Sequence, residues 1–206
     1  QVLDREMENR LQSEIPTLKE LNNKISLKVQ SQYEKNPYPR WVMLGLPLRP
    51  STIKEVVSQI TLNLDNKEIE SVVKPTILIA GCGTGQHSIG TASRFKNADV
   101  LAIDLSRRSL AYAKRKTVEL GINNIKYMQA DILNLDKSEN KFHIIESSGV
   151  LHHMEDPTLG LTILSRCLYR GGLMKIGLYS EEARKHIVKI REEISVSGLE
   201  PEDKQM

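Results

Sequence analysis

The pattern of hydrophobic positions changes near Lys74. Before this point, apolar residues recur at helical spacing within polar sequence, for example at Leu18, Leu21, Ile25 and Val29. This spacing predicts an amphipathic helical arm over residues 1–36, interrupted near Pro16. The arm is expected to stop near Asn36, because Pro37 disfavours helical geometry at the residue before it.

After Lys74, short apolar runs alternate with helical patterns. The runs predict five buried strands, over residues 76–81, 99–104, 124–132, 142–149 and 171–180. The intervening patterns predict helices that begin about His87 and that cover residues 107–120, 157 to about 169, and 180–194. Regular alternation with short connections predicts an α/β fold, a Rossmann-like doubly wound parallel sheet behind the N-terminal helical arm.

Capping residues mark the predicted helix ends. Ser51 or Thr52 is suited to cap a short helix that follows it, and Ser106 is suited to cap the helix over 107–120. Gly121 lies where a helix C-terminal glycine belongs. Asp156 is a capping carboxylate followed by proline at the first helical position.

Two regions follow from these patterns. Residues 1–49 form the helical arm and a proline-rich, aromatic segment, and residues 50–206 form the Rossmann-like domain. After the last predicted helix only "SVSGLEPEDKQM" remains. A sheet of this kind usually continues to six or seven strands, so the chain is either a fragment or has an unusually short sheet.

Composition narrows the function classes. Hydrophobic residues make up 39% of the chain and charged residues 27%, as in ordinary globular proteins, and the net charge is only +3. That charge is too weak to predict a nucleic-acid partner. Cys82 and Cys167 lack metal-type spacing, and no apolar run approaches a membrane span. We therefore expect a cytoplasmic protein with no metal, nucleic acid or membrane partner.

The main chemical signal is the loop "AGCGTG". Gly81, Gly83 and Gly85 follow a predicted strand and precede a predicted helix, where glycines let the backbone approach a ligand. A dinucleotide-binding GxGxxG loop would place its third glycine at Gln86. Asp104 ends the second strand and is placed to accept hydrogen bonds from ribose hydroxyls, which fits NAD and other adenosine cofactors alike.

The third strand adds an adenine site. It ends in "QADIL", so the Asp131 carboxylate is placed to accept the adenine amino proton, and the backbone N–H of Ile132 to meet a ring nitrogen. Together, the motifs "AGCGTG", "AIDLS", "ADI" and "GVLHHMEDP" resemble the class I S-adenosylmethionine-dependent methyltransferases over residues 74–180.

The resemblance implies S-adenosyl-L-methionine as cofactor. It implies that the three glycines pass under the methionine part, that Asp104 holds the ribose, and that Asp131 and Ile132 hold the adenine. The implied cofactor-binding set is Gly81, Cys82, Gly83, Gly85, Asp104, Leu105, Asp131, Ile132 and Glu146. Glu146 enters this set because the family usually has an acid two residues before the first glycine, where this chain has Ile79.

Two histidines follow the fourth strand. His152 and His153 lie where a substrate would enter, and histidine titrates in a range useful for a general base. The alternative interpretation is that one packs against the next helix while the other lies on the surface. Adjacent side chains diverge, so the pair is not expected to bind a metal.

The segment "YEKNPYPRW" holds the single tryptophan of the chain. Its prolines restrict the backbone, so Tyr33, Tyr38, Arg40 and Trp41 are candidate lid and acceptor-pocket residues. Packing of Trp41 into the junction between arm and sheet is the rival interpretation. With "AGCGTGQHS" and "KIGLYSEEAR", this segment resembles a bacterial group of methyltransferase domains often attached to tetratricopeptide repeats.

The predicted activity is methyl transfer to a small-molecule or peptide acceptor by SN2 displacement. A nicotinamide-dependent oxidoreductase on the same kind of sheet is one alternative. A non-catalytic methyltransferase-like binding module is another. The segment "ESSG" after the fourth strand lacks the Asn/Asp-Pro-Pro-aromatic motif of adenine and glutamine N-methyltransferases, which disfavours those acceptors.

Overall fold

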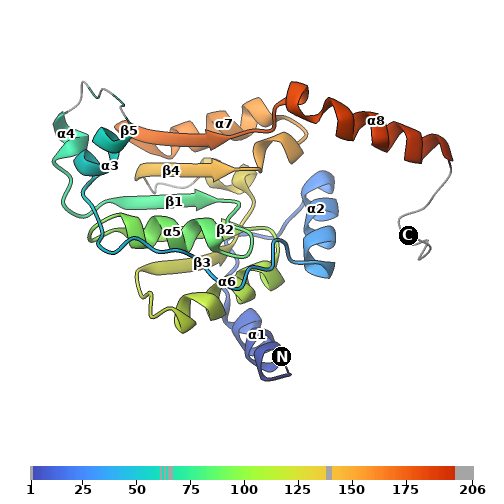
Figure 1. Ribbon diagram of the computed structural model, residues 1–206, viewed down its shortest axis with the longest axis horizontal. Coiled ribbons are helices and arrows are strands. Elements are labelled where there is room, and N and C mark those ends of the chain that lie inside the picture. Colours follow the sequence, from blue (N-terminus) through green and yellow to red (C-terminus); the bar gives the residue numbers. More distant parts are fainter. Residues whose placement is uncertain (1, 61, 63, 65–66, 138–140, 198–206) are drawn as a thin grey trace.

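A five-stranded parallel sheet forms the centre of the protein (Figure 1). The structure is a computed structural model that describes residues 2–60, 62, 64, 67–137 and 141–197. The strands are β1 (Thr76–Ala80), β2 (Asp99–Asp104), β3 (Ile125–Gln129), β4 (Phe142–Ser148) and β5 (Leu168–Gly177), in the order β3-β2-β1-β4-β5. The order reverses between β1 and β4, which is the switch point of a doubly wound sheet. This arrangement confirms the predicted fold class.

Helices cover both faces of the sheet. The chain runs through α3 (Ile53–Gln59), α4 (Lys67–Glu70), α5 (Gln86–Arg94), α6 (Arg107–Glu119), α7 (Pro157–Arg166) and α8 (Glu181–Ser197), with 3-10 turns at Ile132–Lys137 and Leu151–His153. Ile77 and Ile79 of β1 pack into the core shared with α3, α5 and α6. Leu78 points to the other face and packs with α7. β1 is therefore buried on both faces, as its continuous apolar run predicts.

The N-terminal arm is two helices rather than one interrupted helix. α1 (Val2–Glu14) packs on α6, and α2 (Lys24–Lys35) ends just before Asn36, as predicted. Residues 15–23 are not helical, so the predicted stripe through Leu18 and Leu21 was wrong. Instead Gln129 donates its backbone N–H to the carbonyl of Pro16 and accepts from the N–H of Leu18, at 2.8 and 2.9 Å. β3 is an edge strand, and pairing with the arm satisfies the open backbone groups of Gln129.

The capping predictions agree with the structure. Thr52 forms a capping box with Glu55, Ser106 accepts the backbone N–H of Ser109, and Asp156 caps α7. Some boundaries differ. β3 ends at Gln129 rather than at Ile132, and α7 ends at Arg166, with β5 running from Leu168 to Gly177. Leu168 pairs with Phe142 ahead of a register shift, so strand pairing replaces the last predicted turn of the helix.

Candidate functional site

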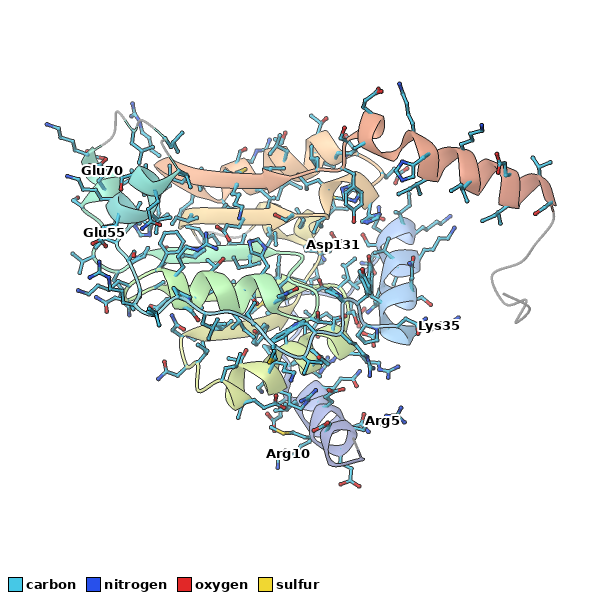
Figure 2. All side chains as sticks on the ribbon, viewed as in Figure 1. Arg5, Arg10, Lys35, Glu55, Glu70 and Asp131 are labelled. Carbon is cyan, nitrogen blue, oxygen red and sulfur yellow. The ribbon has the colours of Figure 1, made fainter. Side chains whose placement is uncertain are left out.

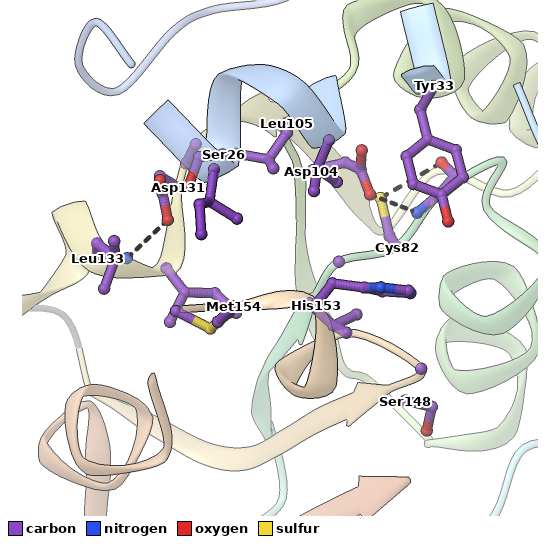
Figure 3. A pocket seen from close by; sticks show the side chains of 18 of the residues that line it. Ser26, Tyr33, Cys82, Asp104, Leu105, Asp131, Leu133, Ser148, His153 and Met154 are labelled. Carbon is purple, nitrogen blue, oxygen red and sulfur yellow. Dashed lines mark hydrogen bonds between the residues drawn. The ribbon is translucent and has the colours of Figure 1, made fainter. Parts of the chain in front are cut away.

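A cavity of about 750 Å³ lies at the carboxyl ends of the strands (Figure 3). Its walls come from the loop after β1, from Asp104 and Leu105 at the end of β2, from residues 130–133 after β3, and from residues 148–150 at the end of β4. α2 closes another side. Figure 2 places Asp131 at the end of the sheet near α2, whereas Glu55 and Glu70 lie at the opposite end. Ligands of open α/β sheets bind at this carboxyl edge.

The three loop glycines have left-handed backbone geometry. Their φ angles are +77° at Gly81, +52° at Gly83 and +87° at Gly85. A Cβ at Gly81 would lie 2.2 Å from the Val150 side chain, and one at Gly85 would lie 2.5 Å from the Ala113 Cβ. Gly81 and Gly83 line the cavity. Gly85 instead packs against α6. It was predicted to bind the cofactor, but in the structure it supports the loop rather than lining the cavity.

Asp104 joins the glycine loop to the start of α6. Its Oδ2 accepts the backbone N–H of Gly83 at 2.8 Å, and its Oδ1 accepts that of Ser106 at 2.9 Å. Burial raises the pKa of the Asp104 carboxyl above its ordinary value, while these amide donors act in the opposite direction. The carboxyl group therefore has a fixed orientation at the cavity wall, with Leu105 and Cys82 beside it (Figure 3). Burial also raises the pKa of the Cys82 thiol, which keeps it neutral.

Asp131 lies in a more apolar part of the cavity. Its side chain is buried, and its Oδ1 accepts the backbone N–H of Leu133 at 2.9 Å. Ile132, Leu133 and Met154 line the cavity next to it. One carboxylate within apolar walls suits a flat heterocycle that carries an amino group.

Glu146 does not line the cavity but lies beneath it, 3% exposed. Its Oε2 is 2.7 Å from the His87 Nε2 and accepts the Thr91 hydroxyl at 2.6 Å. Burial favours the neutral acid, yet the close contact with His87 and the hydrogen bond from Thr91 outweigh it and hold the pKa of Glu146 below its ordinary value. Glu146 can therefore affect a ligand in the cavity only through His87, because His87 lines the cavity and Glu146 does not.

The two predicted catalytic histidines have different surroundings. His153 lines the cavity, whereas His152 lies beside it, with the Nε2 atoms of the two rings 3.1 Å apart. The ring centroid of His152 is 4.0 Å from that of Tyr179. His153 is thus the member of the pair placed to meet a substrate, and a base role for either histidine stays a prediction.

The aromatic segment divides into lining and packing residues. Tyr33 and Tyr38 line the cavity, and burial together with the neighbouring Tyr179 and Asp104 raises the pKa of Tyr33. Trp41 is buried in a small cluster with Ile89 and Tyr112. Neither Trp41 nor the exposed Arg40 is among the described lining residues. The geometry thus supports the packing interpretation for Trp41, and the lid roles of Tyr33 and Tyr38 stay predictions.

Several lining residues were not predicted from the sequence as site residues. They are Ser26 and Val29 of α2, Gln86 and His87 of α5, Lys175 of β5, and Tyr179. His87 had the best chance of detection, because it is the second residue of the helix that follows the glycine loop. The α2 residues could not be found locally, since α2 reaches this edge through long-range contacts such as Gln30 with the Leu105 carbonyl.

Residues 77–172 match a family model described as a methyltransferase domain. An uncharacterized Synechococcus protein is 36% identical over 124 residues, which cover 60% of this chain and 30% of that protein. The malonyl-[acyl-carrier protein] O-methyltransferase of Paenibacillus is 28% identical over 101 residues, covering 48% of this chain and 37% of the enzyme. The chain thus spans about a third of the length of these relatives.

Solved structures agree on the fold. PKMT2 from Rickettsia typhi, in complex with AdoHcy, superposes with a TM-score of 0.58 at 21% identity, covering 76% of this chain and 30% of PKMT2. The chain is thus similar in sequence to methyltransferase domains over residues 77–172, and it has a Rossmann-like fold. The narrower resemblance to the group linked to tetratricopeptide repeats stays a prediction. Within the described residues, no helix has the length and apolar character that crossing a membrane requires.

Proposed function

We propose that this domain binds S-adenosyl-L-methionine in the cavity and transfers its methyl group to a small-molecule or peptide acceptor. One observation supports this above others. A single cavity at the carboxyl edge brings together Gly83, Asp104 and Asp131, which lie at the carboxyl ends of three neighbouring strands. The proposal includes a cytoplasmic location, no nucleic-acid acceptor, and attachment to or association with tetratricopeptide repeats.

The residues present fit the nucleoside part of this cofactor. Each oxygen of Asp104 accepts one backbone amide. A carboxylate has about four acceptor sites, so each oxygen keeps one for a ribose hydroxyl. At Gly83 a Cβ would point to open space except for the Tyr38 carbonyl 3.5 Å away, so the loop leaves room for a ligand.

The adenine fits the other end of the cavity. Asp131 there can accept an amino hydrogen, while Ile132, Leu133 and Met154 supply apolar contact for the ring faces. Asp104 ends β2 and Asp131 follows the adjacent strand β3, so one nucleoside can meet both carboxylates.

When bound, the cofactor supplies an electrophilic methyl group on a sulfonium. The contribution of the chain is to orient the reactants and keep water away. Tyr33 and Tyr38 cover the cavity beside the glycine loop, and the raised pKa of Tyr33 keeps its phenol neutral at physiological pH. His153 is the lining histidine placed to hold a proton where the acceptor must lose one.

The alternatives have less support. A nicotinamide oxidoreductase would usually have glycine at position 86, where this chain has Gln86 as the first residue of α5. A non-catalytic module would have no need for a carboxyl group fixed at each of two neighbouring strand ends.

Calorimetry with S-adenosylhomocysteine and NAD tests the proposal. We expect S-adenosylhomocysteine to bind and NAD to give no heat of binding at the same concentration. The reverse result would replace the proposal with the oxidoreductase alternative, and no heat with either compound would favour the non-catalytic module.

A further inference from the structure

Three charged or titratable groups lie together at the end of the cavity away from Asp131. Glu146 of β4 is buried, His87 of α5 lies against it, and Lys175 is the register partner of Glu146 on β5. His87 and Lys175 line the cavity, whereas Glu146 does not. None of the three belongs to the wall next to Asp104 and Asp131.

The contact with Glu146 determines which atom of His87 is available. Its Nε2 is 2.7 Å from Glu146 Oε2, so this nitrogen faces the protein interior. Glu146 also accepts a hydrogen bond of 2.6 Å from the Thr91 hydroxyl. This bond fixes the orientation of the Glu146 carboxylate, and the carboxylate in turn orients the His87 ring. The Nδ1 of His87 is therefore the ring nitrogen left for a ligand, in the same way that an acid orients a histidine at many sites.

The surroundings favour a negatively charged ligand group. His87 is the second residue of α5, whose first turn carries the positive end of the helix dipole. Lys175 adds a positive charge near Glu146, whose ionised carboxylate is in turn used by His87 and Thr91. With Nε2 turned to Glu146, Nδ1 is a donor only in the imidazolium form, whose two N–H groups can pair with the Glu146 carboxylate and with a ligand carboxylate.

The strand register explains why Glu146 is available here. Glu146 pairs with Ile79 of β1, so the two side chains lie at the same height on the sheet and on the same face. Ile79 is fully buried and apolar. At this height of the sheet the acidic residue is therefore Glu146 of β4 rather than a residue of β1, and it lies under the first turn of α5.

We propose that His87, positioned by Glu146, binds the carboxylate at the amino-acid end of the cofactor through its Nδ1–H. This inference rests on the proposed function, because it assumes that the nucleoside occupies the wall formed by Asp104 and Asp131. Glu146 is then a positioning residue that acts through His87, and Lys175 is a second cation close to the same carboxylate.

Three probes separate the ends of the ligand. S-adenosylhomocysteine carries both the ammonium and the carboxylate, its decarboxylated analogue carries only the ammonium, and methylthioadenosine carries neither. We expect His87→Gln to weaken the binding of S-adenosylhomocysteine about 10- to 100-fold, which is the scale of a lost charge-assisted hydrogen bond. Binding of the other two probes should not change.

Two further variants make the result specific. Glu146→Gln keeps the volume and the bond with Thr91 but loses the charge that orients His87, so it should show the same selectivity for S-adenosylhomocysteine with a smaller loss. His143→Gln is the matched control, since His143 contacts Thr76 at the other end of β4 and does not line the cavity. Its three affinities should equal those of the wild type.

Each result has one meaning. The inference would be overturned if His87→Gln weakened the binding of all three probes equally, or if it left the binding of S-adenosylhomocysteine unchanged. Weakening of both ammonium-bearing probes, with methylthioadenosine unchanged, would assign His87 to the ammonium and overturn the carboxylate assignment. Failure of the wild type to bind any probe would instead remove the proposed function on which the inference rests.

Discussion

The indole Nε1 of Trp41 donates a hydrogen bond of 3.0 Å to the backbone carbonyl of Thr84, inside the glycine-rich loop. Two more bonds join the same segments. The Thr84 hydroxyl donates to the Pro39 carbonyl, and the Tyr112 hydroxyl donates to the Trp41 carbonyl, each at 2.5 Å. The aromatic segment is therefore anchored to the loop and α6 by Trp41, which leaves Tyr38 at the cavity wall.

Replacement of Trp41 by phenylalanine tests this anchor. The variant leaves the buried Thr84 carbonyl without its indole donor, so we expect a loss of about 1–3 kcal/mol in the free energy of unfolding. Affinity for S-adenosylhomocysteine should not change, because Trp41 does not line the cavity. Urea unfolding and calorimetry measure the two quantities. Val42→Ala is the control, since Val42 is 83% exposed and its loss should cost little. Unchanged stability with weaker binding would restore the lid role for Trp41.

Asp104 should determine the affinity for the nucleoside. Asp104→Ala removes two acceptor oxygens at the cavity wall, and we expect binding of both S-adenosylhomocysteine and methylthioadenosine to weaken by about 1–3 kcal/mol. Asp99→Ala is the control on the same strand, because Asp99 lies at the opposite end of β2 in an exposed pair with Lys74. Wild-type affinity in Asp104→Ala would show that the ribose lies elsewhere.

Two glycines of one region should respond to alanine in opposite ways. Gly85 has a φ of +87°, and a Cβ there would lie 2.5 Å from the Ala113 Cβ, so Gly85→Ala should lower the free energy of unfolding by about 2 kcal/mol or more. Gly90 lies within α5, and a Cβ added there would have no neighbouring atom within 4 Å beyond its own stretch of helix. Gly90→Ala should therefore stabilise the protein by about 0.5–1 kcal/mol, from the better helix propensity of alanine. Chemical denaturation of both variants checks the pair, and a Gly85→Ala variant as stable as the wild type would show that the loop is not strained.

The sheet was predictable because its signals are local. Buried parallel strands need continuous apolar runs such as Thr76–Ala80, and the helix caps at Thr52, Ser106 and Asp156 are short-range hydrogen bonds between near neighbours. Asp104 and Asp131 could also be singled out, because the end of each strand fixes which edge of the sheet its next residue occupies.

The remaining features depend on contacts between distant residues. Residues 15–23 are not helical as predicted, because Thr17 pairs with Gln129, which is 112 positions away in the sequence. His87 could be identified as a site residue only from the structure, in which Glu146 of β4 lies beneath it with its Oε2 2.7 Å from the His87 Nε2. In the same way, the division of the aromatic segment into a buried Trp41 and a lining Tyr38 depends on Thr84 and Tyr112.

The acid stability of the protein should depend on Glu146. Its folded pKa lies below the ordinary value of 4.5, because the contact with His87 and the hydrogen bond from Thr91 outweigh burial. A carboxyl group with a lowered folded pKa stabilises the protein at pH values above its unfolded pKa, and this contribution is lost as the pH falls through the folded pKa. Glu146→Gln has no such titration, so the stability gap between wild type and variant should shrink as the pH falls below about 4.5. Urea unfolding at several pH values measures the gap, and the difference between the two proteins removes the contribution of other acids such as Glu55. A gap that stays constant, or widens in acid, would mean that Glu146 is not stabilised as a carboxylate and that His87 lacks the partner that orients it.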